Sequence, residues 1–176
     1  MNFSQRTYLV LEFSSSDWTN QIHCFREKYE PFRRKLPVEI TVIGSSGVGV
    51  FLPEQDAKAA IETIDRFAKR MKPIAISFKG KGNFPDSHLY FFEPTNDLQL
   101  KQLQNEIVKT GLKFGTSPYP YTPHCTIADL GDSPSQEALA ELELIHVPTK
   151  DIIVDAVSFY QLTTDSCQLL HRSVFG

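Results

Sequence analysis

The residues best suited to chemistry lie in segment 121–127, where a histidine stands two residues before a threonine. Side chains alternate between the two faces of a β-strand, so His124 and Thr126 would share one face while Cys125 and Ile127 point into a core. An imidazole can move a proton near neutral pH, and a hydroxyl can hydrogen-bond a phosphoryl oxygen. The segment indicates phosphate-ester chemistry, with a structural histidine on a half-buried strand as the alternative.

A second segment carries a similar pair of side chains. Residues 38–43 read as a β-strand, in which Glu39 stands two residues before Thr41, as His124 stands before Thr126. Each of the two strands begins after a proline and follows the first helix of its half of the chain. Two lobes packed edge to edge would therefore bring all four side chains into one central cleft.

Hydrophobic periodicity predicts the same order of elements in both halves of the chain: strand, helix, strand, helix and strand. Pro53 and the Ser-Pro-Ser-Gln segment at 133–136 predict two of the helix starts. We expect strands at residues 8–13, 38–43, 74–78, 88–92, 124–127, 151–162 and 168–174, and helices at residues 17–35, 53–71, 95–110 and 133–145.

These elements predict an α+β fold with two pseudo-symmetric lobes, each a small antiparallel sheet with two helices, around a central cleft. All 176 residues would form a single bilobal domain, a length that can bury a sizeable core. Lobe one is expected at about residues 1–82, with exchange of a C-terminal strand left open, and lobe two at about residues 83–176.

Composition and charge limit the functions to consider. A net charge of −3 and a pI near 5.9 argue against a general nucleic-acid binder, but a small polyanion can still bind in a local positive pocket. Three scattered cysteines, Cys24, Cys125 and Cys167, form neither a disulfide framework nor a metal-ligand spacing. The N-terminal sequence shows no signal peptide, and no stretch is apolar enough to cross a membrane. We expect a cytoplasmic monomer with no membrane partner.

This constellation resembles the two-histidine (2H) phosphoesterase superfamily, which includes 2′,5′ RNA ligase-like proteins and cyclic phosphodiesterases. That family is marked by two His-x-Thr/Ser-hydrophobic motifs, one in each pseudo-symmetric lobe. Pro-His124-Cys-Thr126-Ile fits the second motif, and the order of strands and helices fits along nearly the whole chain. The first motif is degenerate here, because it reads Glu39-Ile-Thr41 and a carboxylate stands where the histidine should be.

The resemblance implies a metal-independent hydrolase without a cofactor, in which two histidines act as general base and general acid and hydroxyls hold the phosphate. Its substrate and partner would be a cyclic or 2′–5′ phosphodiester of a nucleotide or short RNA. By position, the resemblance assigns proton transfer to His124, and phosphate binding to Thr126 and Thr41.

Three interpretations of Glu39 remain open. In the first, Glu39 is the general base and His124 the general acid, because a neighbouring carboxylate favours protonated imidazole and burial can raise the pKa of a glutamate. In the second, the site has lost turnover and the protein binds a nucleotide or an RNA end without catalysis. In the third, Glu39 lies at an exposed strand end and the cleft is vestigial.

Aromatic residues near the proposed cleft could stack on a nucleobase. The candidates are Tyr119, Tyr121, Phe51 and Phe84. Tyr121 is the strongest of them, because it enters the second motif strand three residues before the histidine.

Other polar segments have simpler explanations. Lys79 and Lys81 could steer a phosphate, although a solvated loop at residues 79–83 is the simpler interpretation. The glycine-rich segment 44–49 matches no nucleotide-binding fingerprint and is interpreted as a turn. The remaining histidines show no metal-ligand spacing and are interpreted as structural; they are His23, His88, His146 and His171.

Overall fold

A computed structural model describes residues 2–176, and its main feature is a seven-stranded sheet whose neighbouring strands are all antiparallel. The strand order is β11-β10-β1-β2-β8-β6-β5, so the two motif strands, β2 and β8, are neighbours. The strands of this sheet are Arg6–Glu12 (β1), Glu39–Ile43 (β2), Phe78–Asn83 (β5), Leu89–Pro94 (β6), Cys125–Asp129 (β8), Ala156–Leu162 (β10) and Cys167–Val174 (β11).

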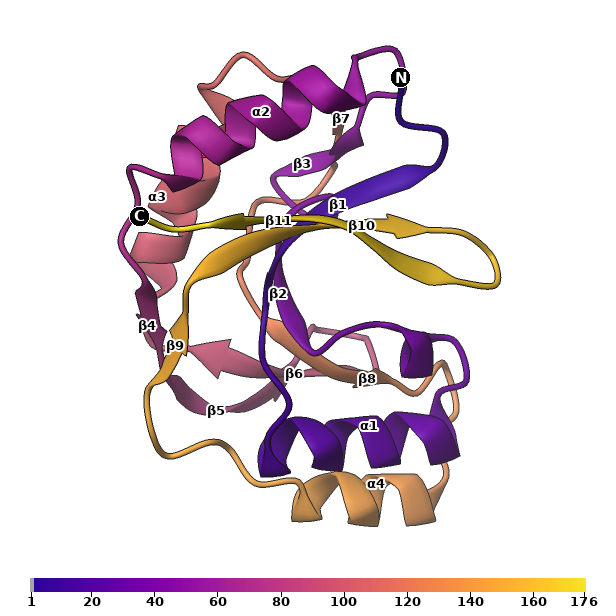
Figure 1. The fold of residues 1–176 in the computed structure, drawn as a ribbon. Coiled ribbons are helices and arrows are strands. Elements are labelled where there is room, and N and C mark those ends of the chain that lie inside the picture. The colour runs from indigo at the N-terminus through magenta and orange to yellow at the C-terminus, as the bar shows by residue number, and fades with distance from the viewer. Residues whose placement is uncertain (1) are drawn as a thin grey trace.

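Two short strand pairs and the helices complete the fold. In Figure 1, helices α1 and α4 lie side by side at one end of the molecule, joined by ion pairs, and α2 and α3 lie at the other end. The helices are Asp17–Tyr29 (α1), Ala57–Ala68 (α2), Asp97–Val108 (α3) and Gln136–Leu144 (α4), with a short 3-10 helix at Arg33–Lys35. The short strands are Val48–Phe51 (β3), paired with Phe114–Thr116 (β7), and Ile74–Ile76 (β4), paired with Ile152–Val154 (β9).

The predicted α+β class with antiparallel sheets is confirmed. Strands from each half of the chain also pair with strands from the other half. The two small sheets that the sequence predicts are joined through the β2–β8 pair into one sheet. β10 and β11, from the C-terminal part of the chain, lie beside β1, whereas β5, from the first half, lies beside β6 (Figure 1). The description as one bilobal domain divided near residue 82 stays a prediction.

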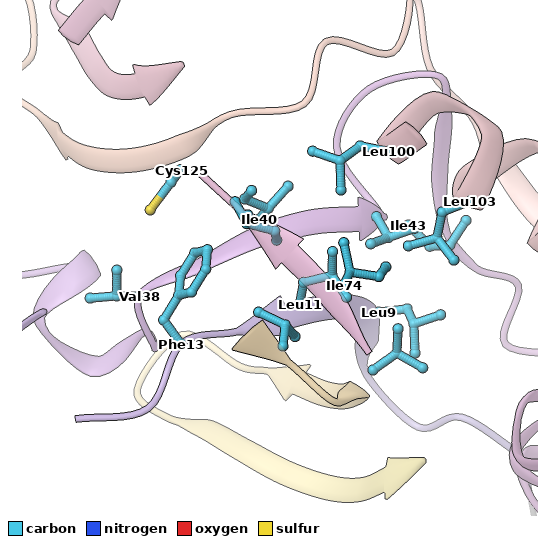
Figure 2. Packing of buried hydrophobic residues seen from close by; sticks show 14 of the residues in the cluster. Leu9, Leu11, Phe13, Val38, Ile40, Ile43, Ile74, Leu100, Leu103 and Cys125 are labelled. Atoms are coloured by element: carbon cyan, nitrogen blue, oxygen red, sulfur yellow. The ribbon is translucent and has the colours of Figure 1, made fainter. Parts of the chain in front are cut away.

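Alternation along the central strands separates the core from the opposite face of the sheet. Leu9 and Leu11 of β1 are fully buried, as are Ile40 of β2 and Cys125 of β8, and Figure 2 shows these residues in one cluster. Burying a large apolar side chain contributes about 1.5–3 kcal/mol, which decides the face of each strand that turns inward. The residues that alternate with these core positions point to the other face.

The first helix is shorter than the sequence pattern predicts. α1 ends at Tyr29, so the expected helix to residue 35 is wrong. Pro31 has no amide hydrogen to donate and disfavours helical geometry at the residue before it. The chain therefore turns at Glu30 and resumes as the 3-10 turn that carries Arg33.

Helices α2 and α4 begin about three residues later than predicted. α2 is capped by Asp56, whose Oδ1 accepts a hydrogen bond from the amide of Ala59 at 2.8 Å, and it does not begin at Pro53. α4 is capped by Ser135, whose Oγ accepts from the amide of Ala138 at 3.1 Å. In both helices the side chain that satisfies a free amide of the first turn sets the boundary.

The expected loop at residues 79–83 is instead strand β5. Its pairing places Lys81 opposite Phe92 and Gly82 opposite Phe91. The sequence pattern also misses β3 and β7. Glycines in all three strands interrupt the alternation of side chains on which the prediction depends.

Candidate functional site

The four candidate side chains meet across the β2–β8 pair. Cys125 of β8 lies opposite a buried isoleucine of β2, and both point into the core. One residue outward on each strand, the antiparallel register places Thr126 across from Glu39, and His124 across from Thr41. These four side chains therefore occupy neighbouring positions on the face of the sheet that is turned away from the core.

The flanking strands extend this face on both sides. On β1, Glu12 lies opposite Glu39, and on β6, Phe91 lies opposite Thr126. Glu39 thus has a carboxyl group on one neighbouring strand and a hydroxyl group on the other.

This face forms the floor of a cleft of about 830 Å³, a volume typical of small-molecule sites. Glu39, Thr41, His124 and Thr126 all line the cleft. Its basic and aromatic lining residues are Arg6, Tyr8, Phe32, Arg33, Phe84, Tyr119 and Tyr160.

The Glu39 carboxyl group is largely shielded from water. Thr41 Oγ1 donates a hydrogen bond to Glu39 Oε1 at 3.0 Å, while Oε2 is buried without a hydrogen-bond partner among the described residues. Burial raises the pKa of Glu39 to about 7, against the opposing effects of the Thr41 hydrogen bond and of the positive charges of Arg26 and Arg33. This carboxyl group can therefore hold a proton near neutral pH.

His124 lies between two aromatic rings, with centroid distances of 5.0 Å to Phe84 and 5.3 Å to Phe91. Its Nδ1 is 2.7 Å from the carbonyl oxygen of Thr122. A carbonyl can only accept, so the hydrogen bond assigns the proton to Nδ1 and leaves Nε2 with a free lone pair. Burial lowers the pKa of His124, which disfavours the protonated imidazole that the first interpretation of Glu39 requires.

A buried arginine that the sequence does not reveal hydrogen-bonds to β8 and to the segment that enters β2. Arg26 of α1 is 2% exposed; its Nε donates to the carbonyl of Ile127 at 2.8 Å and its Nη2 to that of Thr126 at 2.6 Å. Its Nη1 donates to the carbonyls of Leu36 and Pro37, each at 3.2 Å. One guanidinium group therefore ties β8 to the segment that enters β2.

Tyr121 occupies a different position from the other candidates. Its hydroxyl donates to the carbonyl oxygen of Thr41 at 3.0 Å, and it is absent from the described residues that line the cleft. Tyr119 and Phe84 do line the cleft, and Phe51 is buried in the core. Stacking of a base on Tyr121 stays a prediction, and its hydroxyl supports the backbone of β2.

The two lysines near the glycine-rich strand are engaged elsewhere. Lys79 forms an ion pair with Glu93 at 2.6 Å. Lys81 donates to the backbone carbonyls of Leu142 and Glu143 at the end of α4, at 3.1 and 2.9 Å. Neither lysine is among the described cleft-lining residues.

Residues 2–176 hold neither a metal-binding cluster nor a membrane-spanning helix. No group of three or more His, Cys, Asp or Glu side chains in this part of the chain could hold a metal ion. Within the same residues, no helix has the length and apolar character needed to cross a membrane.

The chain matches the model of the 2′-5′ RNA ligase superfamily over residues 13–166, a span that includes both motif strands. It belongs to this superfamily. A "Putative phosphoesterase" of Staphylococcus epidermidis is 22% identical to this member of the superfamily over 141 residues, which cover 79% of this chain and 80% of the relative.

Solved structures show that this superfamily member shares its fold with known proteins. LigT of E. coli in complex with 3′-AMP is 18% identical, with a TM-score of 0.60 over 97% of this chain and 98% of that chain. TT0787 of Thermus thermophilus is 16% identical, with a TM-score of 0.59 over 97% of both chains. At such low identity these likenesses establish the fold alone.

Proposed function

We propose that this protein hydrolyses a cyclic or 2′–5′ phosphodiester of a nucleotide or short RNA. The observation that carries the proposal is the meeting of two proton-transfer groups, Glu39 and His124, with two hydroxyl groups, Thr41 and Thr126, in one cleft. Structures of LigT in complex with 3′-AMP and with phosphate add support for a nucleotide or phosphate ester as the ligand of this protein.

The surroundings of the two titratable groups favour His124 as the general base and Glu39 as the general acid, the reverse of the roles in the first of the three interpretations of Glu39. In the proposed step, Nε2 of His124 takes a proton from the attacking water as its oxygen bonds to phosphorus. The bond between phosphorus and a ribose oxygen breaks, and Glu39 gives its proton to that oxygen. The threonine hydroxyls would donate to the non-bridging phosphoryl oxygens. The step uses side chains alone, so we propose neither a metal nor a cofactor.

The proposal is tested by product analysis with mass spectrometry, using 2′,3′-cyclic nucleotides and 2′–5′-linked oligonucleotides without added metal. Wild type and the variants His124→Ala and His146→Ala are compared. His146 is exposed and lies outside the described lining of the cleft, so it is a matched control. Product from wild type and the control but not from His124→Ala is the expected result. Equal product from all three proteins would indicate a contaminant and contradict the proposal.

The alternative function is non-catalytic binding of a nucleotide or an RNA end. It is favoured by the carboxyl group at position 39, where the superfamily resemblance calls for a histidine. Calorimetric titration of wild type with 3′-AMP separates the two functions when combined with the product analysis. Affinity without product from any substrate would support the binding protein.

We also propose that the protein works as a cytoplasmic monomer. All three cysteines are free, which fits a reducing compartment. Light scattering after gel filtration should give a mass near 20.0 kDa, and twice that mass would contradict the monomer.

A further inference from the structure

The cleft continues along β1 well beyond the proposed reacting centre. Val10, Tyr8 and Arg6 all line it, as alternate residues of one strand. Val10 lies opposite Thr41 on β2. Arg6 is four residues further along β1, which corresponds to about 14 Å at the rise of a β-strand. This backbone separation leaves room for more than one phosphate group between Thr41 and Arg6.

The guanidinium group of Arg6 carries an uncompensated positive charge in this part of the cleft. It is exposed, lies 5.6 Å from the ring centroid of Tyr8, and has no ion pair with the residues that the structure describes. Arg33, the other cation of the cleft, lies 2.6 Å from Glu30 Oε1 and 3.5 Å from Asp129 Oδ2. Arg6 is therefore the more available of the two cations for an anionic ligand.

Aromatic surface fills the space between the two positions. Tyr8 of β1 lies opposite Tyr160 of β10, and both line the cleft. Tyr160 is fixed in place because its hydroxyl donates to Glu12 Oε1 at 2.7 Å. Leu162 lies opposite Arg6 and extends the apolar wall. Such a surface can pack against a base or a ribose between two phosphates.

We infer that Arg6 binds a second phosphate of the substrate, at least one nucleotide away from the reacting phosphodiester. The cleft would then select a short oligonucleotide over a mononucleotide. The inference rests on the proposed function for its reacting centre and deepens it by naming the substrate class. The aromatic pair supplies a surface for the intervening nucleoside, and Arg6 supplies the charge at its far end.

The test compares two substrates of different length, a 2′–5′-linked adenylate trimer and adenosine 2′,3′-cyclic phosphate. Arg6→Gln should lower kcat/KM about tenfold for the trimer, the effect of one lost charge-assisted hydrogen bond, and leave the cyclic mononucleotide within a factor of two. The slope of log(kcat/KM) against log[salt] for the trimer should become shallower by about 0.7. Arg6→Lys should restore most of the loss because it keeps the charge.

Arg70→Gln is the matched control, because it removes the same charge at an exposed residue outside the described lining of the cleft. It should leave both substrates unchanged. An equal loss on both substrates in Arg6→Gln, or no loss on the trimer, would overturn the inference. Arg6 is the first residue of β1 and is exposed, so its replacement should not disturb the fold. Thermal unfolding verifies that each variant is folded.

If the proposed hydrolysis is wrong, the experiment gives a result that differs from a failure of the Arg6 inference. In that case neither substrate gives product that depends on His124, and the same variants are compared by calorimetric binding of the trimer and of 3′-AMP. A weaker affinity of Arg6→Gln for the trimer alone would support the inference for a binding protein. Equal affinities of wild type and Arg6→Gln for both ligands would overturn it.

Discussion

Glu12 of β1 and Glu39 of β2 lie directly opposite each other in the central sheet. Two ionised carboxyl groups in such a pair repel, so the charge of Glu12 disfavours the ionised form of Glu39. Glu12 accepts a hydrogen bond from Tyr160, and its charge adds to the effect of burial in raising the pKa of Glu39. The neighbouring strand therefore supports Glu39 as a proton donor.

Replacing this neighbour should make Glu39 more acidic. In Glu12→Gln, the pKa of Glu39 should fall by up to about one unit because a nearby negative charge is lost. The positive charges of Arg26 and Arg33 and the Thr41 hydroxyl, which also act on Glu39, remain. Titration of the Glu39 carboxyl carbon by NMR measures the change without requiring turnover. A pKa that stays constant or rises in Glu12→Gln would contradict the proposed coupling.

The proton-transfer roles can be separated by the leaving group of the substrate. With a ribose leaving group, Glu39→Gln and His124→Ala should each lower kcat by about 10²–10⁴. With a p-nitrophenyl ester of a nucleotide, whose leaving group needs no proton, Glu39→Gln should recover most of the rate while His124→Ala remains slow. Steady-state kinetics with both substrates measures the contrast. Recovery in His124→Ala instead would assign the acid role to His124.

The two threonines should differ in their effects on pH dependence. Thr126 Oγ1 has no hydrogen bond to the described residues, so Thr126→Val should weaken phosphate binding about tenfold, through the loss of a hydrogen bond to a charged group, without altering the pKa of Glu39. Thr41→Val removes the hydrogen bond that favours ionised Glu39, so this pKa should rise further. Calorimetry with inorganic phosphate and NMR titration measure the two effects. A shifted pKa in Thr126→Val would mean that its hydroxyl also contacts Glu39.

The raised pKa of Glu39 makes stability depend on pH. Between its unfolded value of 4.5 and its folded value of about 7, the folded protein holds a proton that the unfolded chain has lost. The free energy of unfolding should therefore decrease as pH rises through this window, by about 3 kcal/mol in total. Between pH 4 and pH 8, urea unfolding should show a loss about 3 kcal/mol larger for wild type than for Glu39→Gln, because the other groups with shifted pKa values, such as His124, titrate in both proteins.

Replacing an exposed glutamate is the control for the effect of burial on the pH dependence of stability. Glu54 is an exposed carboxylate, so Glu54→Gln should lose stability between the two pH values as wild type does. The same loss in Glu39→Gln as in wild type would contradict the assignment to Glu39.

Removing the buried guanidinium should destabilise the fold. Arg26→Met leaves two carbonyl groups of β8 and two of the segment before β2 without this donor, and the free energy of unfolding should fall by at least about 3 kcal/mol. Arg26→Lys keeps the charge but loses the planar fork, so it should lie between wild type and Arg26→Met. Urea unfolding at constant pH measures all three proteins. A loss below about 1 kcal/mol in Arg26→Met would contradict a structural role.

The sequence predicts which four side chains share the cleft because strand alternation is a local property. Glu39 and Thr41 alternate with buried apolar residues, as do His124 and Thr126, so each pair must face away from the core. The repeated order of elements predicts that the two strands meet at one cleft, but it does not predict that they pair directly as neighbours in one sheet. Glycine-containing strands such as β5 could not be predicted, because they lack a side-chain pattern.

The electrostatics of the site could not be predicted, because they depend on burial and on contacts between distant segments. The sequence motifs predict a carboxylate near His124 but not the rings of Phe84 and Phe91 beside the imidazole. Burial lowers the pKa of His124, the opposite of the direction that the first interpretation of Glu39 requires. Arg26 appears in the sequence as one more charged helix residue, since its burial is a property of the packed fold.

Two of the hydrogen bonds of Arg26 join residues 100 and 101 positions apart in the chain, and the β2–β8 contact joins Ile40 to Cys125. Contacts between such distant segments require the closure of long loops and are slow to form during folding. During synthesis, the first motif strand must wait for more than eighty further residues before its partner exists. Ligand binding in the cleft would therefore report that β2 and β8 have paired.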